Sequence, residues 1–155
     1  MKRIFLLITL CWMVTSVAMG KIGQEGHGGD IVVAEFILRA KNISQQFEKI
    51  EQEFLPDSEF ALLFKEAVES TKISSAEHVY LDNVEVDAIN YPDLEESMIV
   101  IGRNRWLDQR ITPFARNLLV IHEYLSIIGY RDIQYALSYE LTETIQNIKE
   151  EAINN

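Results

Sequence analysis

Apolar residues recur every three or four positions from Asp30 towards Pro56, the spacing that places side chains on one face of an α-helix. Asp30 stands where an N-cap belongs, and Pro56 is expected to end the helix. A second helix is predicted from Ser58 to about Ser70. The two apolar stripes consist of Val33, Phe36, Ile37, Ala40, Ile43, Phe47, Ile50 and Phe54, and of Phe60, Leu63, Phe64, Ala67 and Val68.

After residue 74 the apolar pattern changes to the two-residue period of a β-strand. Asp82 and Asn83 suit a tight turn, so the flanking segments predict a β-hairpin. Pro92 supplies no backbone donor, and the strand is therefore expected to stop at Asn90. A third strand is expected before Gly102. The predicted strand segments are residues 79–81, 84–88 and 98–101.

Two further helices close the chain. Thr112 and Pro113 have the residue types of an N-cap and a first helical position, and Gly129 suits the C-terminal end. Asp132 can cap the last helix. The predicted core positions are Phe114, Leu118, Ile121, Leu125 and Ile128, followed by Ile133, Ala136, Leu137, Leu141, Thr144, Ile145 and Ile148. We therefore expect one α+β domain in the order α-α-β-β-β-α-α, with a small antiparallel sheet packed on helices.

Residues 1–20 have the pattern of a removable secretory signal. Lys2 and Arg3 precede the largely apolar stretch Ile4–Val17, and small residues suited to cleavage follow. Polar residues interrupt this stretch, which is already too short for a membrane anchor of roughly 20 apolar residues. We expect a signal peptide over residues 1–20 and a single domain over residues 21–155, exported to the periplasm or secreted.

The charge of the chain restricts its partners. The sequence has 14 basic and 24 acidic residues, and removal of Lys2 and Arg3 leaves 12 basic residues against the same 24. Such a surface repels phosphate backbones and anionic lipids, so no nucleic-acid partner is expected. No second membrane span is predicted. Cys11 lies in the signal segment, which excludes a disulfide framework in the exported part.

The segment His122–Asp132 carries a recognisable but incomplete metal-site pattern. Zinc proteases use H-E-x-x-H on a helix because residues four apart share a face and the Glu acts as general base. In a longer form of this motif, a Gly and a third zinc ligand follow the second His. His122, Glu123, Gly129 and Asp132 stand in this register, but Ser126 occupies the position of the second His.

A serine hydroxyl is a poor zinc ligand, and this departure leaves two hypotheses. In the first, the protein is not an enzyme: His122 bonds a neighbouring element, Asp132 is a cap, and the protein acts through a protein or cell-envelope partner without a cofactor. In the second, it is a metal-dependent hydrolase, a peptidase, with His122 and Asp132 as zinc ligands and Glu123 as base. A further ligand would then come from His78 or His27.

Basic residues concentrate in one stretch of this acidic chain. They could hold a carboxylate or phosphate ligand, or they could pair with nearby acidic side chains. Trp106 lies among them and is expected in the core or in a lid. The arginines are Arg103, Arg105, Arg110 and Arg116, and the candidate acidic partners are Asp93, Glu95, Glu96 and Asp108.

Several segments along the chain, the motif among them, form a distinctive pattern. They are Gly28-Gly29-Asp30 before Ala34-Glu35-Phe36; Val86-Asp87-Ala88-Ile89-Asn90-Tyr91-Pro92; Arg103-Asn104-Arg105-Trp106; and His122-Glu123-Tyr124-Leu125 with Gly129, Asp132, Tyr135 and Ser138. With these segments the chain resembles a group of small exported proteins of predatory bacteria, which implies an envelope location and no particular activity. The order of elements separately resembles a minimal zincin. That resemblance would make Glu140 or Glu143 the counterpart of the downstream glutamate ligand of gluzincins.

Overall fold

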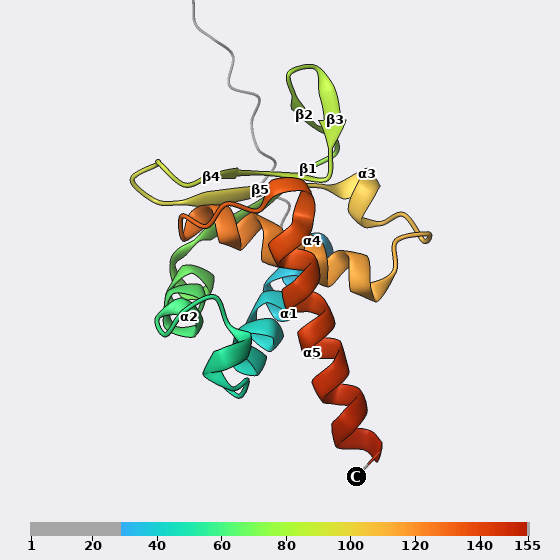
Figure 1. Cartoon of the computed structure of the whole chain (residues 1–155). Coiled ribbons are helices and arrows are strands. Elements are labelled where there is room, and N and C mark those ends of the chain that lie inside the picture. The colour runs from blue at the N-terminus through green and yellow to red at the C-terminus, as the bar shows by residue number, and fades with distance from the viewer. Residues whose placement is uncertain (1–28, 155) are drawn as a thin grey trace, which may run out of the picture.

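The computed structural model describes residues 29–154, with side chains up to Glu151 (Figure 1). The expected signal peptide, residues 1–20, lies outside the described residues, and so does His27. Export therefore stays a prediction. The described chain forms a single α+β domain in which small sheets pack on helices, as the sequence predicts.

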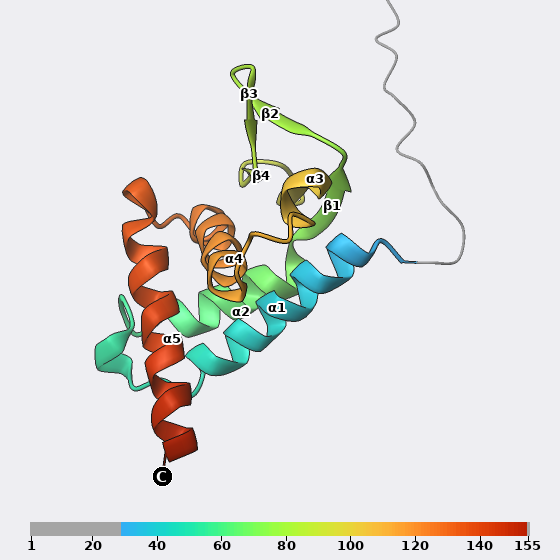
Figure 2. The ribbon, with the colours of Figure 1, turned by 90° about the vertical axis from the view of Figure 1, so that its right-hand side faces the viewer.

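Four main helices form the body of the domain. Figure 2 shows α1 and α2 running together below α4, while α5 runs along one side. None of the described helices is both long and apolar enough to cross a membrane. The helices are α1 (Ile31–Phe47), α2 (Phe60–Ser70), α4 (Pro113–Ile127) and α5 (Ala136–Asn154), with the short helix α3 (Arg103–Trp106) and the 3₁₀ turns η1 (Gln52–Phe54) and η2 (Ile133–Tyr135).

A three-stranded sheet lies over α4 (Figure 1), in the order β1-β5-β4. Its strands are β1 (Lys72–Ala76), β4 (Ala88–Tyr91) and β5 (Met98–Gly102). β4 pairs with β5 antiparallel, but β1 pairs with β5 parallel. The sheet is thus mixed, and the expectation of a purely antiparallel sheet was wrong. Strand β1 was missed because it has one large apolar side chain, Ile73, and pairs with a strand distant in the sequence.

The predicted hairpin is confirmed and stands apart from this sheet. It consists of β2 (Val79–Leu81) and β3 (Val84–Val86), which form their own two-stranded antiparallel ladder. Asp82 and Asn83 have φ values of 49° and 64°, and positive φ at both central residues is typical of the type I′ turn that suits a two-residue hairpin. Ala88 belongs to β4 rather than to the hairpin, so five short strands replace the three expected.

The first helix is shorter than predicted. It ends at Phe47, and Phe54 lies exposed in η1 instead of extending the apolar stripe. Asp30 is confirmed as the N-cap, because its Oδ1 accepts the N–H of Val32 at 3.0 Å. The last turn of α1 has no basic residue. Glu48, which follows it, is unfavourable at the negative end of a helix dipole, and the next residue, Lys49, is favourable there.

The core joins all four helices to the sheet. Its largest buried side chains are Phe36, Phe47, Phe60, Phe64, Trp106 and Tyr124. α4 is buried more widely than one stripe predicts, because the sheet packs on one side and α1, α2 and α5 pack on others. Ile133 and Ile148 were expected in the core and are exposed, whereas Leu141 and Ile145 are buried as predicted.

Candidate functional site

The end of α4 determines where the residues of the zinc-protease-like motif lie. Gly129 has φ of 81°, and its N–H donates to the carbonyl oxygen of Ser126 at 3.2 Å. The N–H of Tyr130 donates to the carbonyl oxygen of Leu125 at 2.8 Å. These two bonds form a Schellman motif, which favours glycine at the left-handed position. The predicted C-cap is therefore confirmed, and the reversal brings Asp132 back to His122.

His122 and Asp132 contact each other directly. Nδ1 of His122 lies 2.8 Å from Oδ2 of Asp132, whose side chain is 1% exposed. Oδ1 of Asp132 accepts the backbone N–H groups of Leu137 at 2.8 Å and Ser138 at 3.2 Å, so the carboxylate also caps the start of α5. Burial opposes ionisation, but the hydrogen bonds from Ser138 and His122 outweigh it and hold the pKa of Asp132 below its usual value.

Tyr135 covers the ring of His122. Gln134 and Tyr135 have φ values of 54° and 62°, a left-handed conformation that is uncommon for residues with side chains. The two rings lie with centroids 4.1 Å apart and planes 32° apart. Burial, together with the negative charges of Glu123, Asp87 and Asp132, raises the pKa of the Tyr135 hydroxyl.

Glu123 lies on the inner side of the same helix. It is 3% exposed, and its Oε2 accepts a hydrogen bond of 2.7 Å from Nδ2 of Asn90 in β4. Burial raises the pKa of its carboxyl, although the bond from Asn90 and the proximity of His122 act in the opposite direction. Glu123 thus joins α4 to the edge strand of the sheet.

The described side chains do not fit a zinc ion. Within residues 29–151, no three His, Cys, Asp or Glu side chains gather in a group that could hold a metal. His78 lies at the base of the hairpin, where Nδ1 contacts Glu85 at 2.9 Å and Nε2 contacts Asn104 at 3.1 Å. Glu143 accepts the hydroxyl of Tyr139 at 2.8 Å. The structure therefore brings His122, Glu123 and Asp132 together but adds no third ligand.

The arginines pair with acidic side chains, as one of the two sequence interpretations predicts. Most of the partners differ from those expected, because the fold brings distant acidic residues to them. Trp106 is a core residue, and its Nε1 donates to Glu35 at 3.0 Å. The ion pairs are Arg103–Asp30, Arg105–Asp87, Arg110–Asp108 and Arg116–Glu35.

Three residues of this constellation were not predicted as site residues. They are Asn90, Tyr135 and Ser138. Asn90 lies in β4, whereas Tyr135 and Ser138 lie beyond the end of α4. Helical spacing could not identify them, because none of them lies on α4.

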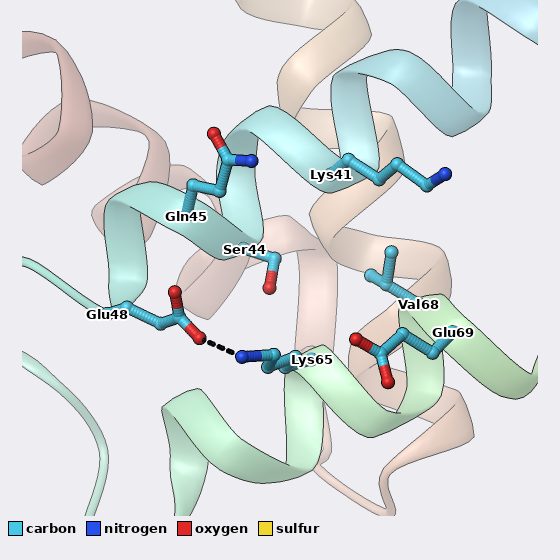
Figure 3. A pocket seen from close by; sticks show the side chains of 7 residues that line it. All are labelled: Lys41, Ser44, Gln45, Glu48, Lys65, Val68 and Glu69. Atoms are coloured by element: carbon cyan, nitrogen blue, oxygen red, sulfur yellow. Dashed lines mark hydrogen bonds and ion pairs between the residues drawn. The ribbon is translucent and has the colours of Figure 1, made fainter.

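A separate hollow of about 240 Å³ lies between α1 and α2 (Figure 3). An ion pair of 2.6 Å between Lys65 and Glu48 crosses its rim, and both side chains are exposed. Its lining consists of Lys41, Ser44, Gln45, Glu48, Lys65, Val68 and Glu69. It holds none of the motif residues and offers no constellation for catalysis.

The site is therefore a linked set of hydrogen bonds among α4, α5 and β4, rather than a set of converging metal ligands. The zincin-like register is a pattern of the amino-acid sequence alone. No protein-family model, curated protein or solved structure matches the chain.

Proposed function

We propose that the chain is an exported, non-catalytic protein that acts through a protein or cell-envelope partner. In this proposal the helix carrying His122 and Glu123 holds the fold together instead of performing hydrolysis. The observation that supports it best is the 2.8 Å contact between His122 and Asp132, the two candidate zinc ligands. A metal would have to compete with that bond for the carboxylate.

Both oxygens of Asp132 are already used. Oδ2 contacts His122, and Oδ1 accepts two backbone N–H groups at the start of α5. Withdrawing the carboxylate would sacrifice a hydrogen bond to a charged group, worth about 1.5–3 kcal/mol. It would also remove a helix cap, worth about 0.5–2 kcal/mol. The arrangement therefore favours a structural role for Asp132.

Glu123 has a structural role of the same kind. Its carboxylate accepts a bond from Asn90 and is almost fully buried, so it joins β4 to α4. A general base must reach the proton that it abstracts, either directly or through one water molecule. With Ser126 in place of a second imidazole, the sequence provides no second ligand on α4 to hold an activated water beside Glu123.

Elemental analysis of the natively purified full chain tests the proposal, together with hydrolysis assays on peptides and on peptidoglycan. We expect zinc far below one ion per chain and no cleavage of either substrate. The hydrolysis assays are repeated after addition of zinc, cobalt or manganese, and cleavage in the presence of any of these metals would contradict the proposal. Cleavage by the metal-free protein would contradict it as well.

One observation favours the hydrolase alternative, which is therefore a second candidate function. His122 is 23% exposed, and its Nε2 has no hydrogen-bond partner among residues 29–151. Further ligands would have to come from outside the described residues, as with His27. Stoichiometric zinc, with cleavage that Glu123→Gln abolishes while the fold remains intact, would establish this alternative.

A further inference from the structure

A hollow of about 260 Å³ lies where α1, α4 and α5 meet, and Figure 2 shows α5 passing beside the C-terminal half of α1. Among the described residues, three basic and four amide side chains line this hollow, and no carboxylate does. An adjoining hollow of about 350 Å³ shares Asn117 and Lys149, and its described lining also has no carboxylate. The chain has 24 acidic and 14 basic residues, so this surface is a local exception to its acidic character.

Arg39 is held in a fixed position in the wall of the hollow. Its Nε and Nη2 donate to Glu35 at 3.0 and 2.9 Å, and its Nη1 donates to Oδ1 of Asn117 at 3.0 Å. The side chain is 22% exposed. A guanidinium has more N–H groups than these bonds use, so donors remain for a ligand. Nδ2 of Asn117 donates to no residue among 29–151 and is a further donor.

Two lysines supply positive charge that no ion pair offsets within the described part of the chain. Lys49 follows the end of α1 and Lys149 lies on α5, and neither side chain makes a hydrogen bond or ion pair with another described residue. Glu35 offsets the charge of Arg39 alone, and Glu150, the residue after Lys149, does not line the hollow. Because charges are screened beyond about 8 Å at physiological ionic strength, a small anion in the hollow interacts chiefly with these cations.

Gln46 adds a requirement for a hydrogen-bond donor. It lines the hollow, and its Oε1 is buried without a hydrogen-bond partner among the described residues. A buried polar atom without a partner costs about 1–3 kcal/mol. A ligand that brings a hydroxyl group to Gln46 therefore relieves this cost, whereas an anion without a donor does not.

From these observations we infer that the hollow binds an acidic sugar, a sugar ring that carries a carboxylate. The carboxylate accepts charge-assisted hydrogen bonds from Arg39 and the two lysines, and the ring hydroxyls bond to the amides, Gln46 among them. Sulfate has the charge without a donor, and a neutral sugar has donors without the charge. The negative charge of the whole chain disfavours a nucleic acid. This inference rests on the proposed function, because it names the class of cell-envelope ligand that a binding protein would take.

The test titrates the ¹⁵N-labelled full chain with D-glucuronate, D-galacturonate and N-acetylmuramic acid, each beside its neutral counterpart, D-glucose, D-galactose or N-acetylglucosamine. We expect saturable chemical-shift changes from at least one acidic sugar, in residues 39–49 and near Asn117 and Lys149. The neutral counterparts, sulfate and cyclohexanecarboxylate should bind at least about tenfold more weakly, a difference of about 1.4 kcal/mol. Equal binding by any of them, or no saturable change with any acidic sugar, would contradict the inference.

Two variants test the residues of the hollow. Lys49→Gln/Lys149→Gln should bind the acidic sugar about tenfold more weakly. Lys41→Gln/Lys72→Gln is the matched control, because it removes the same charge from exposed lysines that do not line the hollow, and it should leave the affinity unchanged. Equal weakening in the two variants would assign the effect to the net charge of the chain and would contradict the site.

Gln46→Met separates a binding role from a structural one. It removes the buried amide without adding volume, so the free energy of unfolding should stay the same or rise, since an unpaired buried atom disappears. Binding of the acidic sugar should nevertheless weaken. Unchanged affinity in Gln46→Met, or a loss of stability that accompanies the loss of binding, would contradict the role of Gln46 as a ligand contact.

Failure of the proposed function gives a different result. Cleavage of peptides or peptidoglycan that is lost in Glu123→Gln would contradict a non-catalytic role, whether or not the hollow binds an acidic sugar. Absence of sugar binding in a protein that cleaves neither substrate would contradict the site alone, because a protein partner would still agree with the proposed function.

Discussion

Nδ2 of Asn90 donates a 2.7 Å hydrogen bond to Oε2 of Glu123, and this bond links the edge strand of the sheet to the buried side of α4. The two residues lie 33 positions apart in the sequence. On the same helix, His122 contacts Asp132 beside the start of α5. Adjacent residues of α4 thus bond to two different neighbouring segments of the chain.

Replacing Glu123 with Gln should stabilise the protein at neutral pH. The pKa of the Glu123 carboxyl is raised in the folded protein. Its contribution to folding stability is therefore fully present below the usual pKa of 4.5 and is lost as pH rises through the raised pKa. Gln cannot ionise and can still accept the bond from Asn90. We expect no difference at acid pH and a gain of about 1–2 kcal/mol near neutrality. Urea unfolding across this pH range measures it, and a pH-independent difference would contradict the explanation.

Asp132→Ala should destabilise the protein by about 2–4 kcal/mol, because it removes both the cap of α5 and the partner of His122. Asp132→Asn should cost less, since Asn is also a good cap. The pKa of Asp132 is lowered, so its stabilising contribution exists above the usual 3.8 and disappears as pH falls through the lowered pKa. Urea unfolding at neutral and acid pH measures both effects. Equal losses in the two variants at neutral pH would contradict a retained cap in Asp132→Asn, and wild-type stability of Asp132→Asn would show that charge is unimportant.

Gly129→Ala should cost about 1 kcal/mol, because alanine is disfavoured at a φ of 81°. An added Cβ would meet no atom within 4 Å, so the cost comes from the backbone alone. Gly29→Ala is the matched control: its Cβ would also meet nothing, and its φ lies outside the left-handed region. Thermal unfolding compares the two variants, and equal melting temperatures would contradict the prediction.

Glu35→Ala should destabilise the protein by about 2–3 kcal/mol. Glu35 accepts hydrogen bonds from Nε and Nη2 of Arg39, at 3.0 and 2.9 Å, and from Nε1 of Trp106 at 3.0 Å. Removing it leaves partly buried donors without a partner. Denaturant unfolding followed by Trp106 fluorescence measures the loss. Glu48→Ala, which breaks an exposed ion pair with Lys65, should cost under about 1 kcal/mol. Equal losses would contradict a special role for Glu35.

Features governed by neighbouring residues could be predicted from the sequence. Asp30 and Thr112 were identified as helix caps, and both accept the expected backbone N–H. Asp82 and Asn83 were identified as a turn because these residues tolerate positive φ. The α+β class follows from such signals, since each depends on the chemistry of a few adjacent residues.

Features that depend on contacts between distant segments required the tertiary structure. Strand β1 is stabilised by parallel pairing with β5, and its own residues barely indicate a strand. The sequence placed His122, Glu123 and Asp132 in one register, but it could not show that His122 and Asp132 bond each other instead of converging on a third ligand. Spacing along a helix determines which residues share a face. What that face meets is decided by the packing of the other elements against it.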